Sequence, residues 1–211
     1  TFFRHAKTED LHIHGTVAKT LDAELSNALS TVNFDELSIL LDDNSSVGFS
    51  RQFIRRRKFI SNVSIHCFGE AKMVSEGVAE LLLGLPAMEN FVLDGAKDLI
   101  DDKTLSHIVQ STSESVNIRS DSQSITAAGL ATAFEKVFSK KGATEVICHV
   151  PFEVIDTFKN GLDDSKFRRV DDSEMNNCIK HLDTGSKFGF NNGYPQWNVV
   201  MKCGPRERRE R

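Results

Sequence analysis

The chain has 211 residues, of which 39% are hydrophobic and 27% charged, and its formal net charge is −4. This length predicts one sizeable globular domain that buries a core without metal or disulfide staples. A slightly negative charge disfavours general nucleic-acid binding, because affinity for phosphates depends on Lys and Arg. No apolar run approaches the roughly 18–20 residues that cross a bilayer, so we expect no membrane contact.

Six strand-like doublets of apolar residues return along the chain, starting 26, 26, 28, 25 and 30 residues apart. Because one β–α unit cannot bury its own apolar face, such a period predicts stacked units. The doublets are Leu11/Ile13, Leu37/Ile39, Val63/Ile65, Phe91/Leu93, Val116/Ile118 and Val146/Cys148.

The doublets predict strands over 11–15, 37–41, 63–67, 91–93, 116–118 and 146–150. Apolar residues at helical spacing predict the intervening helices. These helices cover 21–32, 49–58, 74–85, 105–109, 126–138 and 154–162. Asp101 or Asp102 and Thr126 are expected to be N-caps, whereas Pro86 and Gly142 are expected to end helices.

The period fails after Asp163. The remaining pattern predicts an irregular strand over 167–170, a short helix over 175–182 and a Gly- and Asn-rich stretch over 187–196. Residues 197–203 alternate as a strand that could cap the stack. We therefore expect a β/α repeat domain over 1–163, an irregular C-terminal cap over 164–203 packed on the same domain, and a disordered tail over 204–211.

Four widely spaced cysteines, Cys67, Cys148, Cys178 and Cys203, form no CxxC pair. We interpret them as free thiols in a reducing compartment, and we expect a cytoplasmic or nuclear protein without a signal peptide. Cys67 and Cys148 continue inward-facing strand positions and should be small core residues. Five phenylalanines on helical faces are also assigned to the core: Phe49, Phe53, Phe59, Phe134 and Phe138.

Equivalent strands at this spacing predict an α/β fold, a curved β/α solenoid of about six to seven units with a largely parallel sheet. The unit length and strand core resemble leucine-rich repeats. In one unit Ile39, Leu41 and Asn44 stand at the L-x-L-x-x-N spacing of that family.

Residues 5–203 also resemble the region that follows the F-box in nematode F-box proteins. The resemblance is carried by the phrases at 116–119, 125–130 and 167–171. It implies a protein–protein interaction module that recognises the target of a ubiquitin ligase. A Skp1-type adaptor would bind segments outside this chain. We expect no cofactor.

Residues between the inward positions should form two columns on the concave face of the sheet. The first column is His12, Ser38, Ser64, Val92, Asn117 and Ile147, and the second is His14, Leu40, His66, Asp94, Arg119 and His149. Strands lie about 4.8 Å apart, so His66, Asp94 and Arg119 should be neighbours.

We predict that part of these columns forms a recognition strip for another protein; the alternative is a solvated sheet face with incidental ion pairs. The strip comprises His14, Leu40, His66, Val92, Asp94, Asn117, Arg119 and His149. No metal is expected, because a third histidine would lie about 10–14 Å from the His66–Asp94 pair.

Two other functions stay open. A basic cluster could contact RNA phosphates, although it is more simply a solvated convex helix face. It consists of Arg51, Arg55, Arg56, Arg57 and Lys58. An α/β enzyme could instead use carboxylates at the strand ends, near Asp43, Glu70, Asp94 and Asp121. Phosphate-loop, GxSxG and HExxH motifs are absent from the sequence, so we do not predict an enzyme.

Overall fold

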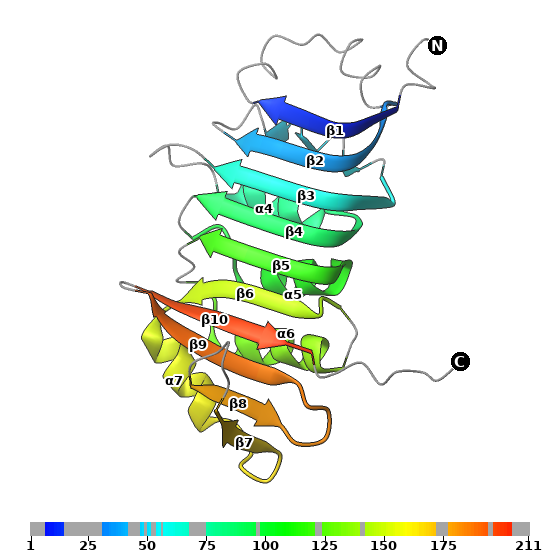
Figure 1. Cartoon of the computed structure of the whole chain (residues 1–211). Coiled ribbons are helices and arrows are strands. Elements are labelled where there is room, and N and C mark those ends of the chain that lie inside the picture. The colour runs from blue at the N-terminus through cyan, green and yellow to red at the C-terminus, as the bar shows by residue number, and fades with distance from the viewer. Residues whose placement is uncertain are drawn as a thin grey trace, which may run out of the picture.

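A computed structural model shows a mixed α/β fold built on one sheet of ten strands (Figure 1). The strands lie in the order β1-β2-β3-β4-β5-β6-β10-β9-β8-β7. The structure describes residues 7–14, 31–41, 47–48, 50–51, 54–55, 57–67, 75–95, 98–120, 124–139, 142–171, 177–193 and 196–203.

The first six strands are parallel, and each pairs with the strand that precedes it in the chain. They are β1 (Lys7–His14), β2 (Asn33–Leu41), β3 (Phe59–Cys67), β4 (Ala87–Gly95), β5 (Thr112–Ser120) and β6 (Glu145–Val150). Every predicted doublet lies in one of these strands, and the predicted largely parallel sheet is confirmed.

The last four strands extend the same sheet in antiparallel fashion. β10 (Gln196–Lys202) pairs with β6, and β9 (Lys187–Gly193), β8 (Cys178–His181) and β7 (Phe167–Val170) follow outward. The predicted strands over 167–170 and 197–203 are therefore confirmed.

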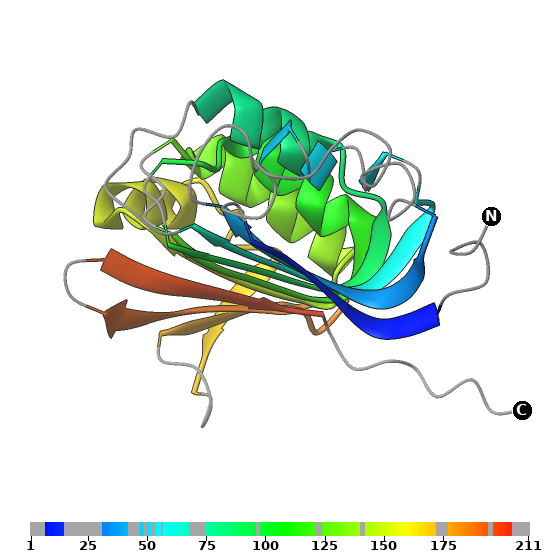
Figure 2. The same ribbon diagram turned by 90° about the horizontal axis from the view of Figure 1, so that it is seen from above.

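The helices lie on one face of the sheet (Figure 2). They are α4 (Ser75–Leu83), α5 (Asp102–Ser111), α6 (Ala127–Phe138) and α7 (Phe152–Asn160). Within the described part of the chain, no helix combines the length and the hydropathy that a bilayer span requires.

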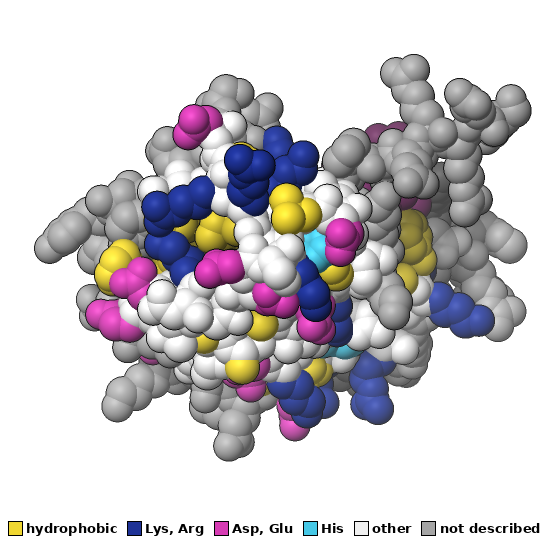
Figure 3. Space-filling view, turned by 90° about the horizontal axis from the view of Figure 1, so that it is seen from below, with side chains coloured by type: hydrophobic (Ala, Val, Ile, Leu, Met, Phe, Trp, Pro, Cys, Tyr) yellow, Lys and Arg dark blue, Asp and Glu magenta, His cyan; other side chains and the backbone are white. Residues whose placement is uncertain are grey.

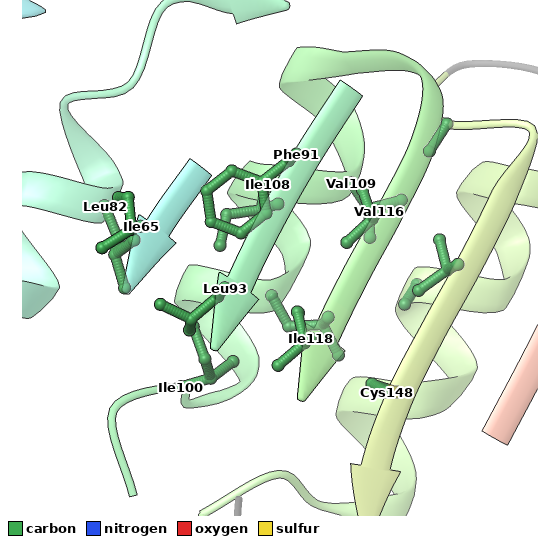
Figure 4. Packing of buried hydrophobic residues seen from close by; sticks show 14 of the residues in the cluster. Ile65, Leu82, Phe91, Leu93, Ile100, Ile108, Val109, Val116, Ile118 and Cys148 are labelled. Carbon is green, nitrogen blue, oxygen red and sulfur yellow. The ribbon is translucent and has the colours of Figure 1, made fainter. Parts of the chain in front are cut away.

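The core lies between the sheet and these helices, as the alternation of apolar residues predicts. Phe91, Leu93, Val116 and Ile118 point from β4 and β5 toward α5, where Ile108 is also fully buried (Figure 4). Cys67 and Cys148 are buried in the same layer, as predicted, and none of the four cysteines forms a disulfide.

Side-chain hydrogen bonds cap the N-termini of α5 and α6 at the predicted residues. The Asp101 carboxylate accepts a hydrogen bond from the Thr104 amide at 2.7 Å, and this hydrogen bonding lowers the pKa of Asp101. Thr126 accepts one from the Gly129 amide at 3.2 Å. The Asp102 carboxylate accepts both the Thr126 amide, at 2.7 Å, and the Thr126 hydroxyl, at 2.6 Å, and so joins α5 to the start of α6.

Gly142 does not end α6, which finishes at Phe138. A Cβ atom at position 142 would lie 2.3 Å from the Val109 carbonyl oxygen. The glycine is therefore required by close backbone packing against α5 rather than by a helix terminus.

The predicted helix over 175–182 is wrong, because residues 178–181 form β8. Cys178, Ile179 and His181 are buried, while Lys180 is only half-buried. Ile179 stands in register with the buried Phe188 of β9, and this pairing determines the local structure. The helical spacing of the apolar residues was thus a false signal.

The assignment of Phe59 to the core is also wrong. Phe59 begins β3, and half of its surface is exposed (50%). Phe134 is buried and Phe138 half-buried, whereas Phe49, Phe53 and residues 21–30 of the predicted helix over 21–32 lie outside the described residues; residues 31–32 are described and are not helical.

Gly95 allows β4 to pass close to β3. Its φ is +108°, and a Cβ atom there would lie 2.0 Å from the carbonyl oxygen of Cys67. We expect Gly95→Ala to lower the free energy of unfolding by about 3 kcal/mol or more, since both backbone strain and a backbone clash oppose it. Urea denaturation followed by circular dichroism measures this loss.

The matched control is Gly77→Ala in α4, where a Cβ atom would meet only the Val47 side chain at an ordinary 3.6 Å. This variant should be neutral, or more stable by up to about 1 kcal/mol. Equal effects of the two substitutions would contradict the close approach of β3 and β4.

Burial raises the pKa of the Cys148 thiol from 9.0 to about 12. The folded chain therefore keeps this proton above pH 9, whereas the unfolded chain releases it. Between pH 9 and 11 the free energy of unfolding should fall by about 1.4 kcal/mol per pH unit through this group. Cys148→Ala should remove that contribution, and identical pH slopes for the two proteins would contradict it.

Candidate binding surface

Figures 1 and 2 show the helices on one face of the sheet, and we call the opposite face the open face. The positions of both predicted columns alternate with the buried positions of their strands and therefore belong to the open face. The register of the first column is as predicted, from His12 and Ser38 across to Asn117 and Ile147. Its described side chains from β2 to β6 are half-buried. Neighbouring strands thus present these side chains side by side.

The second column runs in register from His14 through Leu40, His66 and Asp94 to Arg119. The pairing of β5 with β6 ends at Ile118 and Cys148, one residue before Arg119 and His149. His149 stands in register with Asn198 of β10 instead. The structure therefore brings together most of the predicted strip and leaves His149 at the margin.

His66 and Asp94 form the charged centre of the strip. The His66 Nδ1 and Asp94 Oδ2 atoms are 4.0 Å apart, and the two side chains are 34% and 47% exposed. Arg119 is exposed and stands in register with Asp94, but no ion pair joins these two described side chains. A solvent-accessible pair of this kind contributes about 0–1 kcal/mol to stability.

A third line of side chains on the open face, which we call the polar row, was not predicted. It comprises Asp10, Glu36, Asn62, Asn90, Ser115 and Glu145, one from each parallel strand in register. The sequence signal was present, because each of these residues directly precedes one of the six apolar doublets.

Hydrogen bonds connect the middle of the polar row across four strands. Asn62 donates its amide to Glu36 at 2.6 Å, Asn90 donates to Asn62 at 2.9 Å, and Ser115 donates to Asn90 at 2.7 Å. A chain of side-chain hydrogen bonds fixes the rotamers of its members. The open face is therefore ordered by its own polar contacts as well as by the core beneath it.

The predicted basic cluster is not one continuous patch. Arg51 forms an ion pair with Glu80 of α4, and Arg56 lies outside the described residues. Arg55 and Lys58 are exposed. The Arg51 side chain is 39% exposed, but its charge is already paired with a carboxylate.

The assignment of Arg57 to a solvated helix face is wrong. Its guanidinium lies 4.5 Å from the ring centroid of Phe34 and donates to Asn33 at 3.2 Å and to the Val32 carbonyl. Partial burial lowers the pKa of Arg57. The Arg57 side chain therefore packs against the start of β2 and stabilises it.

Of the four carboxylates of the enzyme alternative, the structure describes only Asp94; Asp43, Glu70 and Asp121 lie outside the described residues. Among the side chains that the structure does describe, no three of His, Cys, Asp and Glu gather as a metal site.

Comparison with protein-family models, with curated proteins and with solved structures gives no match to this chain. The interpretation of the open face therefore depends on its own geometry.

Asn90 is the central link of the polar row. Asn90→Ala should lower the free energy of unfolding by about 1–2 kcal/mol, because it leaves the partly buried groups of Asn62 and Ser115 without this partner. Chemical denaturation measures the change. The control is Asn117→Ala, on the same face and without a side-chain hydrogen bond to a described residue, which should cost less than about 0.5 kcal/mol. A larger loss for the control would contradict the hydrogen-bonded row.

Proposed function

We propose that this chain is a protein-binding module, built as a leucine-rich-repeat-like β/α solenoid, that uses the open face of β1 to β6. The observation that carries the proposal is the register of the two columns: polar, charged and apolar side chains stand one strand apart over a surface that the helices leave uncovered. Sheet faces of stacked repeats are extended surfaces suited to protein recognition.

The composition of the strip fits a non-covalent contact. Leu40 and Val92 are half-buried and can contribute apolar area, while His66, Asp94 and Arg119 can form hydrogen bonds and ion pairs with a partner. Charged groups at such a surface set orientation and selectivity more than raw affinity.

The sequential order of β1 to β6, with each crossover returning to the neighbouring strand, supports the solenoid architecture. Together with the resemblance to the region after the F-box, it supports a role in selecting a substrate for a ubiquitin ligase. In that role a Skp1-type adaptor binds outside this chain.

The test is affinity purification of the full-length gene product from its own cells, followed by mass spectrometry. The baits are the wild type and Asp94→Lys/Arg119→Glu, which reverses the centre of the strip without changing the net charge. We expect a Skp1- and cullin-type adaptor with both baits, and one further protein reduced at least about tenfold in the variant.

A matched control is Lys103→Glu/Glu135→Lys, which exchanges two exposed charges on α5 and α6, away from the open face. It should retain the further protein. Nuclease-sensitive ribonucleoproteins that are lost from an Arg55→Glu/Lys58→Glu bait would favour the RNA-binding alternative and contradict the ligase role.

A further inference from the structure

The polar row continues beyond β6 as a line of cations. Lys202 of β10, Lys187 of β9, Lys180 of β8 and Arg168 of β7 stand in successive register. Lys202 is itself in register with Glu145, the last member of the polar row. We call these four side chains the basic row; they occupy one line across the antiparallel part of the open face.

The whole line changes sign from one end of the sheet to the other. It begins with Asp10 and Glu36, continues through amide and hydroxyl groups to Glu145, and ends in the basic row. Figure 3 faces the β7 end of the molecule and shows Lys and Arg side chains on its upper side, with Asp and Glu side chains among them and further Lys and Arg side chains at the lower edge. Along the line itself, the four positions beyond Glu145 are all cationic.

The basic row by itself should destabilise the folded chain, because like charges directly opposite one another on neighbouring strands repel. The Lys202 ammonium and the Glu145 carboxylate are 3.3 Å apart. Neither Lys180 nor Arg168 has a carboxylate partner among the described residues, and Arg168 is exposed. Lys180 and Arg168, for which the described part of the chain supplies no carboxylate, are therefore suited to an external anion.

We propose that the basic row binds an acidic, extended segment of a partner protein that crosses β10, β9, β8 and β7. The inference rests on the proposed protein-binding function and adds the chemistry of the partner. It uses strands that the recognition strip does not reach.

Two observations favour an acidic peptide over a nucleic acid. The basic row ends at Glu145, and the opposite end of the line carries Asp10 and Glu36, so a continuous polyanion would be repelled beyond β10. In addition, none of the side chains described in β7 to β10 is an exposed aromatic ring on which a base could stack. A short acidic segment avoids both difficulties.

The length of the basic row matches that of a short extended peptide. Four strands at about 4.8 Å spacing place the ends of the basic row about 14 Å apart, and an extended chain rises about 3.3 Å per residue, so about five residues span it. Carboxylates within such a segment can each approach a Lys or Arg side chain.

The test measures fluorescence anisotropy of a labelled peptide of alternating Glu and Ser, about ten residues long so that the row is covered in any register. The Gln–Ser peptide and an oligothymidine are the comparison probes. The wild type should bind the Glu peptide saturably at low salt and more weakly at high salt, and it should bind the Gln peptide at least about tenfold more weakly.

Arg168→Glu/Lys180→Glu should weaken binding of the Glu peptide at least about tenfold. Arg55→Glu/Lys58→Glu alters the net charge equally, away from this row, and should change affinity less than about twofold. Arg168→Gln/Lys180→Gln, which only removes the charges, should give an intermediate loss, with the circular dichroism spectrum unchanged. Asp94→Lys/Arg119→Glu should bind the peptide like the wild type, so failure of the recognition strip and failure of the basic row are distinguishable.

Four outcomes would overturn the proposal. The first two are no saturable binding of the Glu peptide, and equal losses of affinity in Arg168→Glu/Lys180→Glu and Arg55→Glu/Lys58→Glu. The other two are tighter binding of the oligothymidine than of the Glu peptide, and a salt-sensitive dimer in sedimentation velocity that the Arg168/Lys180 variants abolish. The third would assign the row to nucleic acid, and the fourth would assign it to a second copy of the chain.

Discussion

The structure depends on the register of its parallel strands. Each strand of the first half contributes an inward pair, such as Ile65 with Cys67 or Phe91 with Leu93, to a core that the neighbouring units complete. A slip of one residue would turn every inward side chain to the open face, so burial of the core enforces one register. Gly95 and Gly142 allow the close backbone approaches that this stacking requires.

Because the core fixes the register, it also determines which side chains meet on the open face. Residues 25 to 30 positions apart in the sequence become neighbours one strand apart. The hydrogen-bonded chain through Asn62, Asn90 and Ser115 is a direct consequence. The positions of the open face outside this hydrogen-bonded chain can therefore vary in chemistry with little effect on the core.

The strands and the composition of the two columns could be predicted from the sequence, because alternation reports burial directly and parallel order follows from the repeat. Other features depend on partners distant in the chain. The strand conformation of residues 178–181 is enforced by β9, and Arg57 is fixed by Phe34, more than twenty residues earlier. Local spacing carries no information about either contact, so both were predicted wrongly. The polar row was not predicted, although each of its members directly precedes an apolar doublet in the sequence.

The change from parallel to antiparallel pairing after β6 gives the open face its polarity. The parallel strands carry acids, amides and a hydroxyl at one position of the register, and the returning strands carry Lys202, Lys187, Lys180 and Arg168 at the same position. Opposite charges at the two ends of one line discriminate between the two directions in which an elongated partner can lie, because the wrong direction brings like charges together. In the function that we propose, the recognition strip beside this line would meet a partner whose direction is already set, so that selectivity would arise from the two features together rather than from either alone.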